Sequence, residues 1–262
     1  MDISVFREEN IICEIGHGVE GTVYLYNDNG RRVALKKFFT KSEIYKLINQ
    51  CNTYSDSTSI ANLYGRENKE LKLIILKNDP LFKNDIKLLN RVYSMGKFIG
   101  FTSEYEPYDP VTYVDKRKDK IKTLELLQAR YEELNKHGIY IGDFNDDNFC
   151  LTKNGIKLYD IDNFRIDDLD FNVYNPSMME YFNRCSNVKN IDYFCFNYFA
   201  LSYLSSYHLD MVLRGLVINE FPAYLKTPEV LDFIDFLYNM NDDTVIEKTK
   251  DGKQKTLIHL LK

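Results

Sequence analysis

The chain has 262 residues, of which 44% are hydrophobic and 28% are charged, and its formal net charge is −5. This length allows one large domain or two smaller lobes, each with a sizeable hydrophobic core. The composition is that of a globular protein, and the negative balance without a polybasic block gives no reason to expect nucleic-acid binding. No uninterrupted apolar stretch reaches membrane-spanning length, so no membrane span is expected.

The cysteine count and the N-terminus indicate the compartment. The five cysteines are odd in number and show no CxxC spacing, which favours reduced thiols over a disulfide framework or a zinc site. No basic region followed by an apolar run is visible at the N-terminus, so a cytoplasmic protein is predicted, in a host cytoplasm if the chain is a delivered effector. The chain has no tryptophan but 20 tyrosines and 17 phenylalanines, which predicts aromatic cores.

The first third of the chain is predicted to be rich in strands, over residues 11–15, 21–26 and 32–38. The first two are joined by residues 16–21, which read G-H-G-V-E-G and match the pattern G-x-G-x-x-G. A dinucleotide fingerprint requires a helix directly after its glycines, whereas the following GTVYLY favours a strand. The glycines therefore predict a strand–loop–strand hairpin whose backbone N–H groups can lie over phosphates.

Lys36 follows this hairpin within the run Val-Ala-Leu-Lys. Taken alone it would be a solvated strand lysine, the role that alternation gives to Lys37. The order of glycine loop, valine and strand lysine resembles the protein kinase family, which carries G-x-G-x-x-G-x-V followed by V-A-I-K. The resemblance implies that ATP binds, that Lys36 holds the α- and β-phosphates, and that the nucleotide is contacted by Ile15, Gly16, Gly18, Gly21, Val23 and Ala34.

A helix over about residues 62–77 is predicted to end at an Asn-Asp-Pro sequence. Family kinases need a carboxylate on this helix to hold the strand lysine. The spacing to Pro80 implies Glu70 as the partner of Lys36. Glu67, one turn earlier on the same face of the helix, is the alternative partner. The simpler interpretation of Glu70 is a solvated residue without a partner in the site.

Two further strands are predicted over residues 86–93 and 97–105. The second resembles the strand that leads into a kinase hinge, with Ser103 behind the adenine pocket. The resemblance implies that the hinge offers backbone groups to adenine from Glu104, Tyr105 and Glu106.

The resemblance as a whole implies an α+β, bilobal, protein kinase-like fold. Residues 1–106 are expected to form an N-lobe with an antiparallel sheet and one helix, together with an insertion at 41–66. Residues 107–262 are expected to form a mainly helical C-lobe.

The stretch over residues 137–164 gathers acidic and amide side chains around a predicted hairpin. An Asn-Gly turn joins its two short strands, so Asn148 before the first and Asp160 after the second come to the same end of the ribbon. Together with Asp143, these side chains can hold a hard cation through oxygen atoms and orient a hydroxyl nucleophile.

Residues 141–148, which read I-G-D-F-N-D-D-N, resemble the kinase catalytic loop H-R-D-x-x-x-x-N. The resemblance implies that Asp143 is the catalytic base and that Asn148 and Asp160 are magnesium ligands. It also places Cys150 in the adenine pocket.

The same resemblance covers the helices on either side of this stretch. An amphipathic helix is predicted over residues 120–136 and an apolar one, buried all round, over residues 191–205. Asp192 stands at the position whose carboxylate anchors the backbone of the catalytic loop.

Several positions depart from the family pattern. Ile141 and Gly142 replace the histidine and arginine of H-R-D, so control through a phosphate-reading arginine is not expected. Asn145 stands where Ser/Thr kinases have a lysine. The glycine of D-F-G is absent from residues 160–162, which read D-I-D, and Asp162 is a candidate second metal ligand.

The sequence therefore predicts an atypical kinase that moves the γ-phosphate of Mg-ATP to a hydroxyl, with serine or threonine of a protein as the first choice of acceptor. A small-molecule kinase of the aminoglycoside phosphotransferase type is an alternative, favoured by Asn145 and by the absence of an A-P-E triplet. A pseudokinase that binds nucleotide or a partner is a third. Retention of Lys36, Asp143, Asn148 and Asp160 argues against the third.

Overall fold

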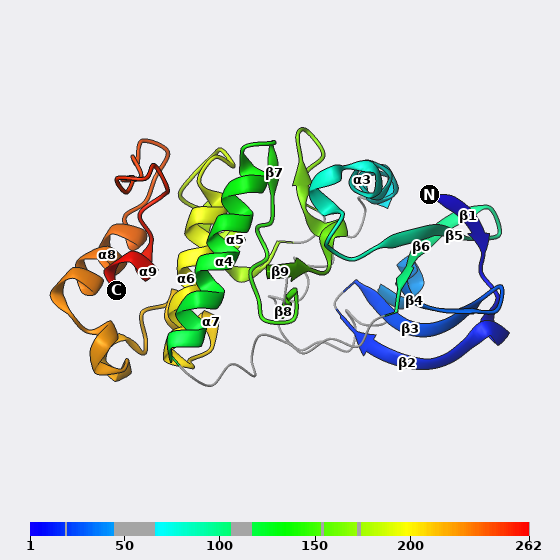
Figure 1. The fold of residues 1–262 in the computed structure, drawn as a ribbon, viewed down its shortest axis with the longest axis horizontal. Coiled ribbons are helices and arrows are strands. Elements are labelled where there is room, and N and C mark those ends of the chain that lie inside the picture. Colours follow the sequence, from blue (N-terminus) through cyan, green and yellow to red (C-terminus); the bar gives the residue numbers. More distant parts are fainter. Residues whose placement is uncertain (19, 45–65, 106–116, 153–154, 172–173, 262) are drawn as a thin grey trace. The chain divides into compact units, whose positions relative to one another are not determined.

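The computed structural model describes residues 1–18, 20–44, 66–105, 117–152, 155–171 and 174–261. It is an α+β structure that divides into two compact units, Met1–Tyr108 and Asp109–Lys262. Most of the predicted insertion at 41–66 lies outside the described residues, as does Glu106 of the predicted hinge. Figure 1 labels the strands of the first unit β1 to β6, and the helices of the second unit α4 to α9.

The first unit is built on a six-stranded sheet in the order β1-β5-β6-β4-β3-β2. Its strands are β1 (Asp2–Val5), β2 (Ile11–His17), β3 (Gly21–Asp28), β4 (Arg31–Phe38), β5 (Leu88–Ser94) and β6 (Lys97–Glu104). Neighbours are antiparallel except β1, which pairs in parallel with β5 at the edge. The five predicted strands are confirmed. The sequence pattern did not indicate β1, because its four residues form too short a run.

Alternation along β4 gives the sheet two chemically different faces. Val33 and Leu35 are buried in an apolar core with Tyr26 and Val92. Lys36 is one residue out of phase with Leu35, so its side chain lies on the opposite face of the strand. The side chain of Lys36 is thereby directed away from the core that holds Val33 and Leu35.

One helix of the first unit, α3 (Arg66–Asn78), precedes β5 and confirms the predicted stop at Asn-Asp-Pro. Asp79 ends it by accepting a hydrogen bond from the N–H of Leu81 at 2.9 Å, which starts a short 3-10 turn at Pro80. Leu73 and Leu76 are buried and fix the inward face of the helix.

The second unit is mainly helical. Its helices are α4 (Arg117–Asn135), α5 (Pro176–Phe182), α6 (Ile191–Ser205), α7 (Leu209–Leu213), α8 (Pro228–Tyr238) and α9 (Leu257–Leu260). Two short ribbons pair β8 (Phe149–Thr152) with β9 (Gly155–Leu158), and β7 (Ile139–Tyr140) with β10 (Arg165–Ile166). As predicted, α6 is buried almost all round, and it lies beside α4 (Figure 1).

Aromatic rings fill the core between these two helices. Tyr131 of α4, Phe144 and Phe196 of α6 form a triangle with ring centroids 5.1 to 5.9 Å apart. Phe144 follows Asp143 directly, so the ring packing fixes the chain next to that carboxylate. Cys195, also in α6, is a buried free thiol whose pKa is raised by burial.

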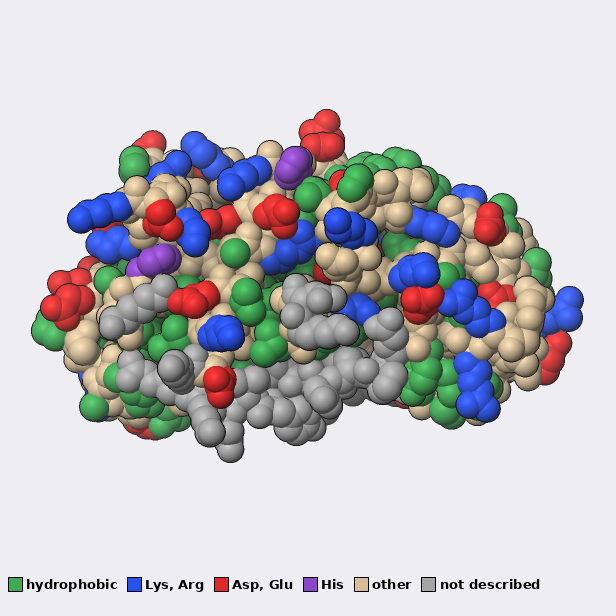
Figure 2. All heavy atoms as spheres, viewed as in Figure 1, with side chains coloured by type: hydrophobic (Ala, Val, Ile, Leu, Met, Phe, Trp, Pro, Cys, Tyr) green, Lys and Arg blue, Asp and Glu red, His purple; other side chains and the backbone are tan. Residues whose placement is uncertain are grey.

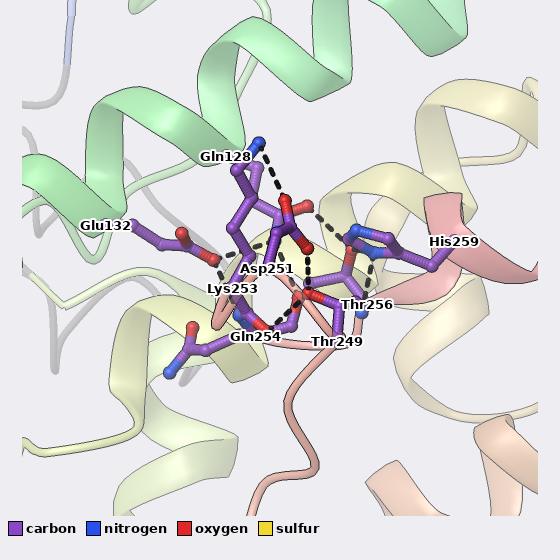
Figure 3. A network of polar contacts seen from close by, with 8 residues as sticks. All are labelled: Gln128, Glu132, Thr249, Asp251, Lys253, Gln254, Thr256 and His259. Atoms are coloured by element: carbon purple, nitrogen blue, oxygen red, sulfur yellow. Dashed lines mark hydrogen bonds and ion pairs between the residues drawn. The ribbon is translucent and has the colours of Figure 1, made fainter.

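The C-terminal segment is tied to α4 by a polar network (Figure 3). Gln128 donates to the carbonyl of Gln254 at 2.8 Å, and its amide oxygen accepts from the hydroxyl of Thr256 at 2.8 Å. One turn later, Glu132 accepts from the N–H of Gln254 at 3.0 Å. His259 forms a capping box with Thr256, which gives its ring a structural role. Because these buried polar groups have partners, the segment is held in one register against α4.

No helix among the described residues has the length and apolar character needed to cross a lipid bilayer. On the face shown in Figure 2, basic and acidic side chains are interspersed rather than gathered by sign. Ion pairs at the surface of the described residues include that of Lys255 with Glu247 at 2.8 Å.

Candidate functional site

The 141–148 loop is fixed through its backbone to a buried carboxylate of α6. Asp192 accepts from the N–H of Ile141 at 3.0 Å and from the N–H of Gly142 at 2.7 Å. The side-chain amide of Asn135 is oriented so that its nitrogen faces hydrogen-bond acceptors, and this nitrogen donates to the Asp192 carboxylate at 2.7 Å. Burial raises the pKa of Asp192 to about 7, while the three N–H donors act in the opposite direction. The predicted anchoring of this loop by Asp192 is confirmed.

The carboxylate of Asp143 is held by amide groups on both oxygens. Asn148 Nδ2 donates to Asp143 Oδ2 at 3.0 Å and to the Asp143 carbonyl at 3.1 Å. Asn175 Nδ2 donates to Asp143 Oδ1 at 2.6 Å. The Asp143 side chain is half-buried, so part of it remains accessible. A carboxylate positioned in this way can orient a hydroxyl group and accept its proton.

Asn175 is a site residue that the sequence pattern did not single out. Its Oδ1 accepts from the N–H of Met178 at 2.8 Å, which makes it the N-cap of α5. The same side chain therefore caps a helix with its oxygen and holds Asp143 with its nitrogen. The available signal was the Asn-Pro pair, which predicts a helix start but not a contact with a loop far away along the chain.

The β8–β9 ribbon brings Asn148 close to Asp160, as predicted. The strands pair along their whole length, and the N–H of Tyr159 donates to the carbonyl of Asn148 at 2.7 Å, which extends the pairing by one residue. Asp160 comes next in the chain, in the left-handed region with φ of +51°, and starts a 3-10 turn at Ile161–Asn163. Asp162, in this turn, is fully buried.

Asn148 and Asp160 present the donor set that suits a magnesium ion. Hard cations prefer oxygen ligands from carboxylates and amides. Because the amide nitrogen of Asn148 donates to Asp143, the amide oxygen is the atom left to act as a ligand. The residues at this end of the ribbon therefore fit the group that the sequence predicts.

Gly142 is required by the shape of the loop. Its φ is +67°, and a Cβ on it would lie 2.8 Å from Met178 Cε and from Phe171 Cε1. The place where the resemblance would put an arginine side chain is thus filled by two apolar side chains. The absence of that arginine is therefore part of how the loop packs.

We expect Gly142→Ala to lower the free energy of unfolding by roughly 2–4 kcal/mol, from left-handed strain and from overpacking against Met178. Gly252 is the matched control, because its φ is +82° and nothing lies within 4 Å of a Cβ placed on it. Gly252→Ala should show the strain alone, about 1–2 kcal/mol. Urea unfolding of both variants checks this, and equal losses would contradict the packing explanation.

Asn145 shapes the turn within the 141–148 loop. Its Oδ1 accepts from the N–H of Asp147 at 3.0 Å, and its carbonyl accepts from the N–H of Asn148 at 3.2 Å. A lysine has no acceptor atom and cannot make the first of these bonds. The residue that replaces the family lysine is therefore engaged in local structure.

In the first unit, the glycine loop is a tight connection between β2 and β3. The N–H of Gly18 donates to the carbonyl of Gly21 at 3.0 Å. Gly21 lies so close to β4 that a Cβ on it would overlap the carbonyl of Lys37. Gly16 faces Val23 across the hairpin, where a Cβ would make an ordinary contact at 3.6 Å. The close approach of β4 therefore requires glycine at position 21, whether or not a ligand binds to the loop.

The predicted pairing of Lys36 with Glu70 is wrong. The ammonium of Lys36 lies 3.3 Å from the carboxylate of Glu20 in the glycine loop. Glu70 Oε1 accepts instead from Arg91 Nη1 at 2.7 Å and from the hydroxyl of Tyr93, both on β5. Glu70 thus joins α3 to the sheet rather than holding the strand lysine.

The rotation of α3 explains this correction. Successive residues of a helix are about 100° apart, so neighbours point in different directions. Lys69 and Lys72 turn inward and are buried, and the Lys69 ammonium contacts Glu20, whereas Glu70 turns toward β5. The side chain of Glu67, the alternative partner, lies outside the described residues. A lysine therefore occupies the inward position expected for a carboxylate.

The remaining predicted nucleotide contacts are spread over several strands. Ile15 and Tyr105 are exposed, Val23 and Ala34 are half-buried, and Cys150 is buried with its Sγ 3.4 Å from the Tyr159 hydroxyl. The N–H of Glu104 donates to the carbonyl of Lys87 at 3.0 Å, so it is already engaged within the first unit. Its carboxylate pairs with Lys87 and Arg31, and these contacts lower the pKa of Glu104.

Each unit thus contains one cluster of polar side chains. The second unit gathers Asp143, Asn148, Asn175 and Asp192, with Asp160 at the ribbon end, and the first gathers Glu20, Lys36 and Lys69. A scan against protein-family models and a search of the curated proteins found no match to the chain. The choice of a function therefore depends on the chemistry of these two clusters.

Proposed function

We propose that the protein is a kinase-like phosphotransferase that moves the γ-phosphate of Mg-ATP to a hydroxyl group. The observation that carries this is the carboxylate of Asp143, held on both oxygens in a loop whose backbone is bonded to the buried Asp192. Phosphoryl transfer needs positioning and charge neutralisation more than covalent chemistry. A fixed carboxylate beside oxygen ligands for a cation supplies the positioning.

The residues of the second unit divide into two roles. Asp143 orients the acceptor hydroxyl and takes up its proton. Asn148 and Asp160 hold a magnesium ion, which when bound neutralises phosphate charge. Asp192 and Asn175 touch neither substrate nor metal in this scheme, and they act as positioning residues for Asp143.

The residues of the first unit bind the nucleotide in this scheme. Lys36 contacts the phosphates, and the backbone N–H groups of the glycine loop approach them. Val23 and Ala34, on the face of the sheet that also carries Lys36, contact the adenine. The mainly antiparallel sheet with α3 before β5 is compatible with the N-lobe that the resemblance implies.

Serine or threonine of a protein is the acceptor that we place first. A specific observation favours a small hydroxyl-bearing molecule as the second candidate. Asn145 is tied into the loop turn and supplies no cation beside the transferred phosphate, where Ser/Thr kinases have a lysine. A phosphotransferase of the aminoglycoside type does not need that lysine.

Labelled ATP separates these outcomes. The purified protein is incubated with Mg²⁺ and γ-labelled ATP, alone and with a cell lysate, and proteins are then separated from small molecules. Label on serine or threonine in protein bands supports the first acceptor, and label confined to small molecules supports the second. A thermal shift with ATP without any transfer of label contradicts the proposed reaction and leaves a nucleotide-binding module. If ATP causes no thermal shift and no label is transferred, the result contradicts nucleotide binding as well.

We expect Asn175→Ser to lower kcat by about tenfold and to leave the KM for ATP unchanged. Serine is a favoured N-cap and keeps the bond to the Met178 N–H, but it has no amide nitrogen to donate to Asp143. Thr227→Ser, at the N-cap of α8, is the matched control and should change neither constant. A wild-type kcat in Asn175→Ser would contradict a positioning role for Asn175.

A further inference from the structure

One carboxylate of the first unit lies between two lysines that come from different elements. Glu20 stands between the second and third glycines of the glycine loop. Its Oε2 is 3.3 Å from Lys36 Nζ on β4, and its Oε1 contacts Lys69 Nζ on α3. The side chains of Glu20 and Lys69 are 7% and 3% exposed, so this is an interior ion pair rather than a surface contact.

An aromatic ring lies beside the same two lysines. Lys69 Nζ lies 4.3 Å from the ring centre of Phe38, and Lys36 Nζ lies 5.8 Å from it. Phe38 is two residues after Lys36 in β4 and therefore points to the same side of the strand. Cation–π contacts of this kind help to hold an ammonium group at a fixed position. Two positioned cations around one carboxylate form a site for an anion.

We infer that Lys36 and Lys69 together bind the phosphates of the nucleotide, and that Glu20 occupies this site when no nucleotide is bound. The inference rests on the proposed function, because it takes the glycine loop as the phosphate-binding element. A carboxylate and a phosphate present anionic oxygens to an ammonium group in the same way, but a triphosphate offers more oxygens and more charge. A triphosphate therefore displaces the carboxylate, whereas a nucleoside without phosphates leaves it in place.

A rival role for Glu20 is that of a permanent partner that orients Lys36, the role predicted for Glu70. The position of Glu20 in the glycine loop favours the role of a competitor for the phosphates. A Cβ on Gly18, two residues earlier, would meet only the Gly21 carbonyl, at 4.0 Å, and a glycine has more backbone freedom than a residue within a helix. The two roles also predict opposite results. Removal of a competitor tightens phosphate binding, and removal of an orienting partner weakens it.

Calorimetric titration of wild type, Glu20→Gln and Lys69→Met with three probes tests the inference. The probes are Mg-ATP, inorganic tripolyphosphate and adenosine. Glu20→Gln should bind Mg-ATP and tripolyphosphate about tenfold more tightly than wild type, because no fraction of the protein is then self-occupied. Lys69→Met should bind both about tenfold more weakly. Adenosine affinity should be equal in all three proteins.

Two further variants serve as controls. Glu43→Gln is the matched control, because Glu43 pairs with Lys37 at 3.6 Å on the other face of β4, and its affinities should equal those of wild type. Glu20→Asp keeps the negative charge but is one methylene shorter, so it reaches two lysines less well. It should show a smaller tightening in the same direction, and it provides the measurement if Glu20→Gln does not fold.

Each outcome has a separate meaning. Equal or weaker Mg-ATP binding by Glu20→Gln, with wild type still binding ATP, overturns the competitor role and leaves the proposed function intact. A change in tripolyphosphate affinity without any ATP binding supports the anion site and overturns the proposed function. Failure of every protein to bind either phosphate probe overturns both.

Discussion

An Asp143→Ala variant is expected to lose roughly 10²- to 10⁴-fold in turnover of phosphoryl transfer, because it lacks the group that orients the hydroxyl and accepts its proton. The fold should survive. The amides of Asn148 and Asn175 lose a partner, but the side chain they hold is half-buried and water can replace it. Initial rates of label transfer measure the turnover. Thermal unfolding measures the stability, which is expected to fall by about 1 kcal/mol.

Asp147→Ala is the matched control for this experiment. Asp147 lies in the same 141–148 loop, also carries a carboxylate, and is exposed to solvent. Its backbone N–H makes the bond to Asn145, and alanine keeps that bond. Turnover in Asp147→Ala should match wild type. Retained turnover in Asp143→Ala, or an equal loss in both variants, would remove Asp143 from the reaction.

The loop and its anchor could be predicted because they depend on order along the chain. The Asn-Gly pair in the sequence predicts a hairpin, and the observed register of β8 with β9 brings Asn148 and Asp160 to one end. The anchoring role of Asp192 was implied by the resemblance to the kinase family. Its physical reason is that a carboxylate in a helix that is apolar on every side is a buried charge, and such a charge requires donors. The two N–H groups of the 141–148 loop supply them.

The partner of Lys36 could not be predicted in this way. A count of residues back from Pro80 chooses a position on α3, but it does not give the rotation of the helix about its axis. That rotation is set by the burial of Leu73 and Leu76, and it turns Lys69 toward Glu20 and Glu70 toward Arg91. The sequence also gave no reason to expect a glutamate from the glycine loop as the counter-ion.

Asn175 shows a second kind of limit. Its bond to Asp143 joins residues 32 positions apart, and no helical or strand period connects them. The local pattern around it predicts the N-cap of α5 correctly. The nitrogen of the same amide then serves a contact that exists only after α5 has packed beside the loop, so tertiary structure decides this site residue.

The second large effect is expected from Asp192→Ala. The substitution leaves the backbone N–H groups of Ile141 and Gly142, and the amide of Asn135, without their acceptor in a buried position. Unsatisfied buried donors cost roughly 1–3 kcal/mol each, so the free energy of unfolding should fall by about 3 kcal/mol or more. The loop loses its fixed position, and a misplacement of about 1 Å lowers kcat on the order of 100-fold.

A loss of stability alone does not explain a loss of kcat, and Asn197→Ala separates the two. Asn197 is a buried polar residue of the same helix α6, but it accepts from the N–H of Leu257 at 2.9 Å and so faces the C-terminal segment. Its substitution should lower stability and leave kcat near wild type at a temperature where both proteins are folded. Asp192→Asn, which keeps one acceptor oxygen, should be more stable than Asp192→Ala and still show a reduced kcat with an unchanged KM for ATP. If kcat in the three variants follows stability alone, Asp192 supports the fold without positioning Asp143. If kcat falls only in the Asp192 variants, the buried carboxylate acts through the loop backbone.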